Sequence, residues 1–200
     1  MYTPTLTGLA DRSHLMSRMI TLDTHIADIV NLFRWEELND VILCGHSYAG
    51  WVVAGALETL RDKVKAIVLL DAHFPHNGER GVDLSNNKKR ILRAAKRCES
   101  STPPPTAAYF KVNKTDRAWV NHMLTPQPIG LSFQPIQLTG QRERINTKVY
   151  IRATDFKSAP FDKAYRRAKL AGFRMRRLKC GHDVMIDKPD ELAQVLLDIE

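Results

Sequence analysis

The stretch that most constrains the fold runs from Val41 to Gly50, Val-Ile-Leu-Cys-Gly-His-Ser-Tyr-Ala-Gly. Its first four residues are apolar, and a longer apolar segment follows over 51–60. A short apolar run predicts a buried parallel strand, and the segment after it predicts a helix. Ser47 lies at the turn between them, with the small residues Gly45 and Ala49 two positions to either side. This pattern is typical of a nucleophile elbow, in which a sharp turn exposes a reactive serine.

The predicted helix would begin just after this serine. Its first N–H groups and the positive end of its dipole would then point at the reacting atoms. We expect the backbone N–H of Tyr48 to stabilise an oxyanion. His46 lies next to the nucleophile near the substrate-binding region, but we expect its side chain to point away from Ser47.

A serine hydroxyl needs a base within hydrogen-bond reach and a third group that orients the base. His182 is the candidate base, because it follows a predicted strand, lies beside a glycine and precedes the last predicted helix. Two carboxylates compete for the third role: Asp155, just past the strand 149–153, and Asp71, at the end of the strand 64–70. Both strand ends open onto the same edge of a parallel sheet, so the residues alone leave this choice open.

Strands and helices alternate along the chain, which predicts a mostly parallel sheet of the α/β class with flanking helices. We expect one domain over 1–200, with its core in 1–71 and 147–200. The segment from about 72 to 146 is rich in Pro, Asn, Ser and charge, and we interpret it as a small cap inserted over the strand ends. Further strands are expected at 147–153 and 173–178, and helices at 26–33, 85–97, 115–123, 161–170 and 187–199.

The net charge of +8 arises largely from two basic stretches, 88–97 and 163–179. Few aromatic residues are interleaved with them, which disfavours nucleic-acid binding and favours solvated helix faces. No apolar run is long enough for a transmembrane helix, and the first residues do not resemble a signal peptide. Three widely spaced cysteines predict neither a metal motif nor a disulfide framework, and they favour a reducing cytoplasm.

With Ser47, His182 and the strand order established, the chain resembles the α/β-hydrolases nearly from end to end. It is most similar to a bacterial esterase-like branch related to plant methylesterases of the salicylate-binding type and to hydroxynitrile lyases. The matching stretches are 2–14, 22–26, 45–50, 70–72 and 181–183, together with 116–120 and 124–128 in the expected cap.

This resemblance implies a serine hydrolase that cleaves a small-molecule ester through a Ser-His-Asp triad and an acyl-enzyme, without a cofactor or metal. Two alternatives remain. A lyase would use the same triad with a cap lysine, for which Lys157 or Lys163 is available. A non-catalytic relative would hold an apolar ligand under Trp119 and Phe133.

The sequence departs from the family pattern in two ways. Relatives usually begin with a further strand, a His-Gly loop and a helix, so we expect an N-terminally truncated sheet that lacks the usual second oxyanion donor. In addition, Phe156 occupies the position at which the lyases and methylesterases carry the triad acid, which keeps Asp71 in contention.

Overall fold

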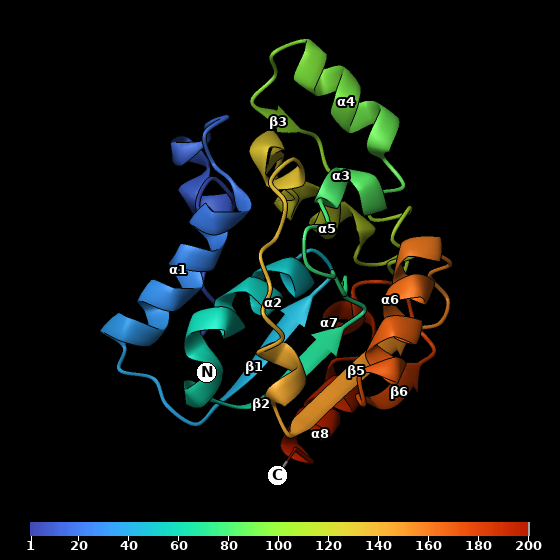
Figure 1. The fold of residues 1–200 in the computed structure, drawn as a ribbon. Helices are drawn as coiled ribbons and strands as arrows, with labels where there is room; N and C mark the ends of the chain where they lie inside the picture. Colours follow the sequence, from blue (N-terminus) through green and yellow to red (C-terminus); the bar gives the residue numbers. More distant parts are fainter. Residues whose placement is uncertain (200) are drawn as a thin grey trace.

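Four parallel strands form the central sheet of the computed structural model, which describes residues 1–199 (Figure 1). In spatial order they are β1 (Val41–His46), β2 (Val64–Leu70), β5 (Thr147–Ala153) and β6 (Arg174–Leu178). Each strand pairs in parallel with its neighbour. The spatial order therefore follows the order along the chain, and all four carboxyl ends lie at one edge of the sheet.

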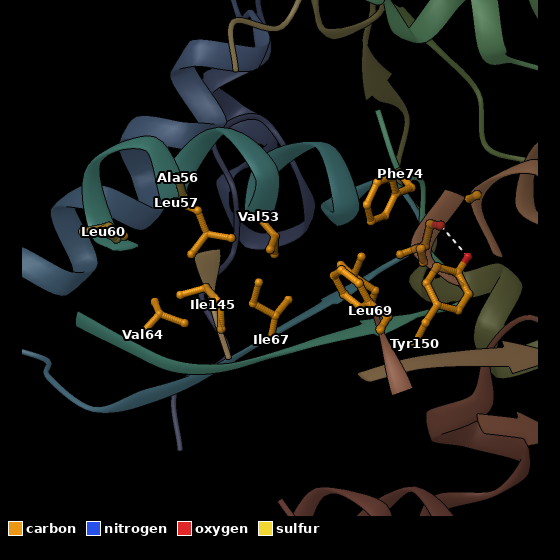
Figure 2. Packing of buried hydrophobic residues seen from close by; sticks show 14 of the residues in the cluster. Val53, Ala56, Leu57, Leu60, Val64, Ile67, Leu69, Phe74, Ile145 and Tyr150 are labelled. Atoms are coloured by element: carbon orange, nitrogen blue, oxygen red, sulfur yellow. Dashed lines mark hydrogen bonds between the residues drawn. The ribbon is translucent and has the colours of Figure 1, made fainter. Parts of the chain in front are cut away.

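Helices cover both faces of this sheet (Figure 1). One face packs against α1 (Leu22–Trp35), α2 (Ala49–Leu60) and α6 (Ala159–Leu170), and the other against α7 (Val184–Asp187) and α8 (Pro189–Leu197). Alternation along β2 explains the arrangement, because successive strand side chains point to opposite faces. Ile67 and Leu69 pack under α2, as Figure 2 shows, whereas Val68 lies in the cluster beneath α7 and α8.

The strand β2 has the bounds expected from its sequence, and six of its seven residues are buried. For β1, the expected burial was wrong. Ile42 is 37% exposed and Cys44 is also exposed. Within residues 1–199 β1 is the outer strand of the sheet, and α7 and α8 pack mainly on β2 and β5, so one face of β1 has no helix over it.

Most of the segment between β2 and β5 lies beyond the carboxyl ends of the strands, and its last part runs back past α2 to the start of β5 (Figure 1). Its short elements include α4, which covers the middle of the range expected for a helix at 85–97, and α5, which confirms the helix expected at 115–123. In chain order they are α3 (Gly81–Leu84), α4 (Lys88–Lys96), β3 (Ser101–Thr102), α5 (Arg117–Met123), β4 (Gln127–Pro128) and the 3-10 turns η3 (Ile129–Ser132) and η4 (Arg142–Arg144).

Two further 3-10 turns, η1 (Ala10–Leu15) and η2 (Arg61–Lys63), complete the elements. Within residues 1–199, no helix combines the length and the apolar character needed to cross a membrane.

Candidate active site

Ser47 follows β1 directly and has a φ of +52°, a left-handed conformation that is uncommon for a residue other than glycine. Two neighbouring glycines make this turn sterically possible. A Cβ on Gly45 would lie 2.7 Å from Val53 Cγ2, and one on Gly50 would lie 2.1 Å from the carbonyl oxygen of His73. The N–H of His73 donates to the carbonyl oxygen of Ser47 (3.0 Å), so the chain leaving β2 packs directly on the elbow. Of these two glycines, Gly50 therefore has less room for a side chain.

The structure brings Ser47, His182 and Asp71 together in a hydrogen-bonded chain. The hydroxyl oxygen of Ser47 lies 2.8 Å from Nε2 of His182, and Nδ1 of His182 lies 2.6 Å from Oδ2 of Asp71. Asp71 is fully buried and His182 is 1% exposed. A carboxylate only accepts hydrogen bonds, so Nδ1 carries the proton and Nε2 is free to accept the Ser47 hydroxyl proton. This arrangement can activate a nucleophile.

The two candidate acids are in different environments. Asp71 also has a positive φ of +42°, and such strained residues cluster at functional sites. Asp155 is exposed, and its backbone N–H donates to the carbonyl oxygen of Cys180 (3.1 Å). Within residues 1–199, its carboxylate makes no hydrogen bond to His182. The structure therefore places Asp71, and not Asp155, on the imidazole.

A buried arginine completes the surroundings of Asp71, and sequence reasoning missed it. Nη1 of Arg152 lies 2.6 Å from Oδ1 of Asp71, and the N–H of Ala153 donates to the same oxygen (3.2 Å). Burial opposes the charge of Arg152, but the carboxylates of Asp71 and Asp162 raise its pKa. The sequence contains a signal for this contact, because an arginine within the buried part of β5 requires a partner for its charge.

His46 and His73 lie beside His182, and the imidazoles of both are held neutral. Burial and the neighbouring His182 lower the pKa of His46 to about 3 and that of His73 to about 4. The side chain of His46, which we expected to point away from Ser47, contacts the loop that carries His182. Its Nε2–H donates to the carbonyl oxygen of His182 (3.0 Å), and the two rings pack with centroids 4.5 Å apart. His46 therefore fixes the loop that carries His182.

Tyr48 contributes two groups to the site. Its backbone N–H has no hydrogen-bond acceptor within residues 1–199, and it lies at the start of α2. Its hydroxyl donates to Nδ1 of His25 (3.2 Å), whose Nε2–H donates to the carbonyl oxygen of Thr7 (2.8 Å). Burial raises the pKa of Tyr48 far above its usual value, so the phenol stays protonated. This network ties the first residues of the chain to the elbow.

A cavity of about 630 Å³ opens above Ser47 and His182. Its walls come from the first ten residues, the elbow, the segment between β2 and β5, and the loop before α6, with Thr5, Tyr109, Leu131 and Phe161 among the lining residues. The ring of Phe161 also packs 4.8 Å from that of His182. The cavity wall therefore contains both polar and apolar side chains, and the cavity is open to solvent.

Several residues considered from the sequence lie outside this cavity. Trp119 is 56% exposed on α5 and does not line it, and Phe133 packs instead against the buried residues around α4. Lys157 and Lys163 are exposed, and Lys163 borders a smaller cavity of about 300 Å³ beside the first. The ligand position expected under Trp119 and Phe133 was therefore wrong, and neither lysine lies at the elbow.

Residues 2–195 match the family model described as "Alpha/beta hydrolase family". The chain is 36% identical to a carbendazim hydrolyzing esterase from Nocardioides sp. (strain SG-4G), over 97% of this chain and 85% of that protein. It is 22% identical to the putative chloroplastic methylesterase 14 of Arabidopsis thaliana, over 98% of this chain and 63% of that protein. Among solved structures, an extracellular alpha/beta-hydrolase from a Paenibacillus species superposes with a TM-score of 0.84 at 20% identity, over 99% of this chain and 86% of that one.

The fold and the family match define the class: the chain belongs to the alpha/beta hydrolase family. Esterases are among its relatives, which supports an enzyme that hydrolyses ester bonds. The resemblance to the plant methylesterase branch, inferred from the elbow and its flanking stretches, is confirmed.

Proposed function

We propose that the chain is a serine carboxylesterase that cleaves a small-molecule ester with Ser47 as nucleophile, His182 as base and Asp71 as the orienting acid. One observation carries the proposal: the unbroken hydrogen-bonded chain from Ser47 Oγ through both ring nitrogens of His182 to Asp71, at 2.8 and 2.6 Å. It lies at the base of a cavity that a small ester can enter.

The first half of the reaction forms an acyl-enzyme. Ser47 Oγ attacks the ester carbonyl carbon while its proton passes to Nε2 of His182. Asp71 stabilises the imidazolium that forms, because Nδ1–H donates to its carboxylate. The tetrahedral intermediate then collapses: the C–O bond to the alcohol breaks, and the proton on Nε2 transfers to the departing oxygen. The acyl group remains on Ser47.

The second half restores the free serine. A water molecule gives its proton to Nε2 of His182 and attacks the acyl carbon. When this second tetrahedral intermediate collapses, Ser47 Oγ takes the proton back and the carboxylic acid leaves.

The negative charge on each tetrahedral intermediate needs preorganised donors. We assign the backbone N–H of Tyr48 as one of them, because it is unengaged within residues 1–199 and sits at the start of α2, where the helix dipole favours negative charge. We also propose that residues 72–146 act as the cap of a single domain, because residues of this segment line the cavity above Ser47.

The names of the relatives guide the first choice of substrate. One is named as a carbendazim hydrolyzing esterase and another as a putative methylesterase. Together with the aromatic residues Trp51, Tyr109 and Phe161 in the cavity wall, this supports small alkyl esters of aromatic acids. The three unpaired cysteines support the predicted cytoplasmic location.

The test is steady-state hydrolysis of p-nitrophenyl acetate and of methyl esters of aromatic acids. Ser47→Ala should lower kcat/KM by at least about 10³-fold, since it removes the nucleophile. Ser132→Ala is the matched control, because Ser132 lines the same cavity, whereas within residues 1–199 the ring nitrogens of His182 hydrogen-bond to Asp71 and Ser47 and not to Ser132. Turnover that survives Ser47→Ala but falls in Ser132→Ala would overturn the assignment.

A further inference from the structure

Arg152 is the most completely bonded charged side chain near the site. Each of its five N–H donors has an acceptor, and its side chain is 7% exposed. Nη1 donates to Oδ1 of Asp71 (2.6 Å) and to the carbonyl oxygen of Ala153 (2.5 Å). Nη2 donates to the carbonyl oxygen of Phe156 (2.8 Å) and to Oδ1 of Asp162 (2.9 Å). Nε donates to the same oxygen of Asp162 (3.2 Å). A guanidinium held at five points has one orientation.

The contacts of Arg152 connect two groups that touch the imidazole of His182. Asp71 accepts the proton on Nδ1, and the ring of Phe156 packs 4.7 Å from the imidazole ring. Arg152 holds the carboxylate of the first and the backbone of the second. A change at Arg152 would therefore affect His182 through both groups, although among residues 1–199 the side chains of Arg152 and His182 share no hydrogen bond.

Charge gives a second reason why this arginine matters. A fully buried carboxylate is costly unless a cation and hydrogen bonds compensate it. While His182 is neutral, Arg152 is the cation in contact with Asp71, at 2.6 Å. Without it, the buried negative charge of Asp71 would favour a second proton on His182, and a doubly protonated imidazole cannot act as a base.

We propose that Arg152 is a positioning residue of the catalytic unit: it keeps Asp71 ionised and aimed at Nδ1 of His182, and it holds His182 in the neutral form that can accept the Ser47 proton. This inference rests on the proposed function of Asp71 and His182.

The other titratable groups around His182 do not replace this cation. His46 and His73 are held neutral by burial, and burial raises the pKa of Asp183. The titratable groups that face His182 from the elements packed around it are Asp71 and His73 after β2, His46 at the end of β1, and Asp183 beside it. Arg152 in β5 is charged and reaches His182 through Asp71.

The experiment follows the imidazole of His182 by NMR across pH, in parallel with the pH profile of kcat/KM. Arg152→Met removes the charge and keeps much of the side-chain volume. Arg152→Lys keeps the charge but cannot make five bonds. Asp162→Asn removes the negative charge beside Arg152, while the amide oxygen can still accept from the guanidinium. Arg167→Met is the matched control, since Arg167 pairs with Glu79 (2.7 Å) and contacts neither Asp71 nor His182.

In Arg152→Met the imidazole of His182 should keep its proton to a higher pH, by about one pH unit, the size expected when a nearby cation is removed. The acidic limb of kcat/KM should move up by the same amount. Asp162→Asn should leave the limb in place or move it slightly down, because an anion is lost there. Arg167→Met should not move the limb.

Two outcomes separate this inference from the proposed function. If the wild type hydrolyses no ester but His182 titrates higher in Arg152→Met, the proposed function falls and the effect of Arg152 on His182 stands. If the wild type is active and the titration and the pH profile are unchanged in Arg152→Met, the inference falls alone. Should Arg152→Met fail to fold, Arg152→Lys decides: a kcat reduced about tenfold with an unmoved acidic limb supports positioning, and an unchanged kcat overturns it.

Discussion

The imidazole of His182 packs against the phenyl ring of Phe156, with the ring centroids 4.7 Å apart. Phe156 is buried just past β5, at the position where the family resemblance places the acid. The carboxylate that reaches Nδ1 comes instead from Asp71, at the end of the neighbouring strand β2. The backbone N–H of Asp71 donates to the carbonyl oxygen of Ile151 in β5 (2.7 Å). The acidic partner of His182 thus comes from the end of β2, and the apolar ring of Phe156 occupies the position after β5.

Asp71→Asn should therefore lower kcat by about 10³–10⁴-fold, because an amide can no longer hold His182 in the tautomer that accepts the Ser47 proton. Asp155→Asn should leave kcat within about twofold of the wild type, since Asp155 is exposed and away from the imidazole. Steady-state kinetics on one ester measures both. The reverse ranking would move the acid role to Asp155.

Gly50→Ala should destabilise the fold by at least about 3 kcal/mol, because its Cβ would lie 2.1 Å from the backbone carbonyl of His73, which cannot rotate away. Gly81→Ala serves as the control, since its Cβ would find its nearest atom at 3.4 Å, and it should change stability by less than about 1 kcal/mol. Urea denaturation gives both values. Equal stabilities of the two variants would contradict the packing described for the elbow.

His46 should make the protein less stable in mild acid. Its pKa falls from 6.5 in the unfolded chain to about 3 in the folded chain because of burial, so only the unfolded chain binds a proton there between these values. The stability that His46 contributes is therefore present above about pH 6.5 and is lost as the pH falls, by up to about 1.4 kcal/mol per pH unit.

The variant His46→Gln removes this titration and retains a donor for the carbonyl of His182. Its unfolding free energy should drop less between pH 7 and pH 5 than that of the wild type, by about 2 kcal/mol. His122→Gln, at an exposed position on α5, should keep the wild-type slope. If His46→Gln shows the wild-type slope as well, His46 is not held neutral.

Substrate binding should depend on Tyr109 and not on Trp119. Tyr109 lines the cavity above Ser47, whereas Trp119 lies outside it on the exposed side of α5. Tyr109→Ala should raise KM for an aromatic ester by about three- to tenfold with a smaller change in kcat, the signature of lost ground-state binding. Trp119→Ala should leave both constants unchanged. A raised KM in Trp119→Ala alone would show that the ligand enters from another side.

The sequence predicted the sheet and the strand-turn-helix around Ser47 well because both rest on local patterns. The run Val41–Cys44 with its small neighbours marks the elbow, and the apolar runs 64–70 and 147–153 became the parallel strands β2 and β5. His182 was found from its place between a strand and a helix, and the structure puts it on Ser47.

The rest depended on contacts between distant segments. The choice between Asp71 and Asp155 is decided by which carboxylate lies beside His182, 111 positions from Asp71 in the chain. The partners of His46, His25 and Arg152 likewise become visible only when strands and loops are side by side. Trp119 lies outside the cavity because the packing of distant segments decides which residues of the segment 72–146 line it.

The most direct measurement is labelling of the purified protein with a fluorophosphonate, followed by peptide mapping by mass spectrometry. A phosphonate ester on Ser47 that forms in the wild type, and is lost in His182→Ala and slowed at least about 10²-fold in Asp71→Asn, is the predicted result. Folded wild-type protein that carries no adduct, or an adduct on Ser132 or Ser158 in the same cavity, would contradict a nucleophile built from Ser47, His182 and Asp71.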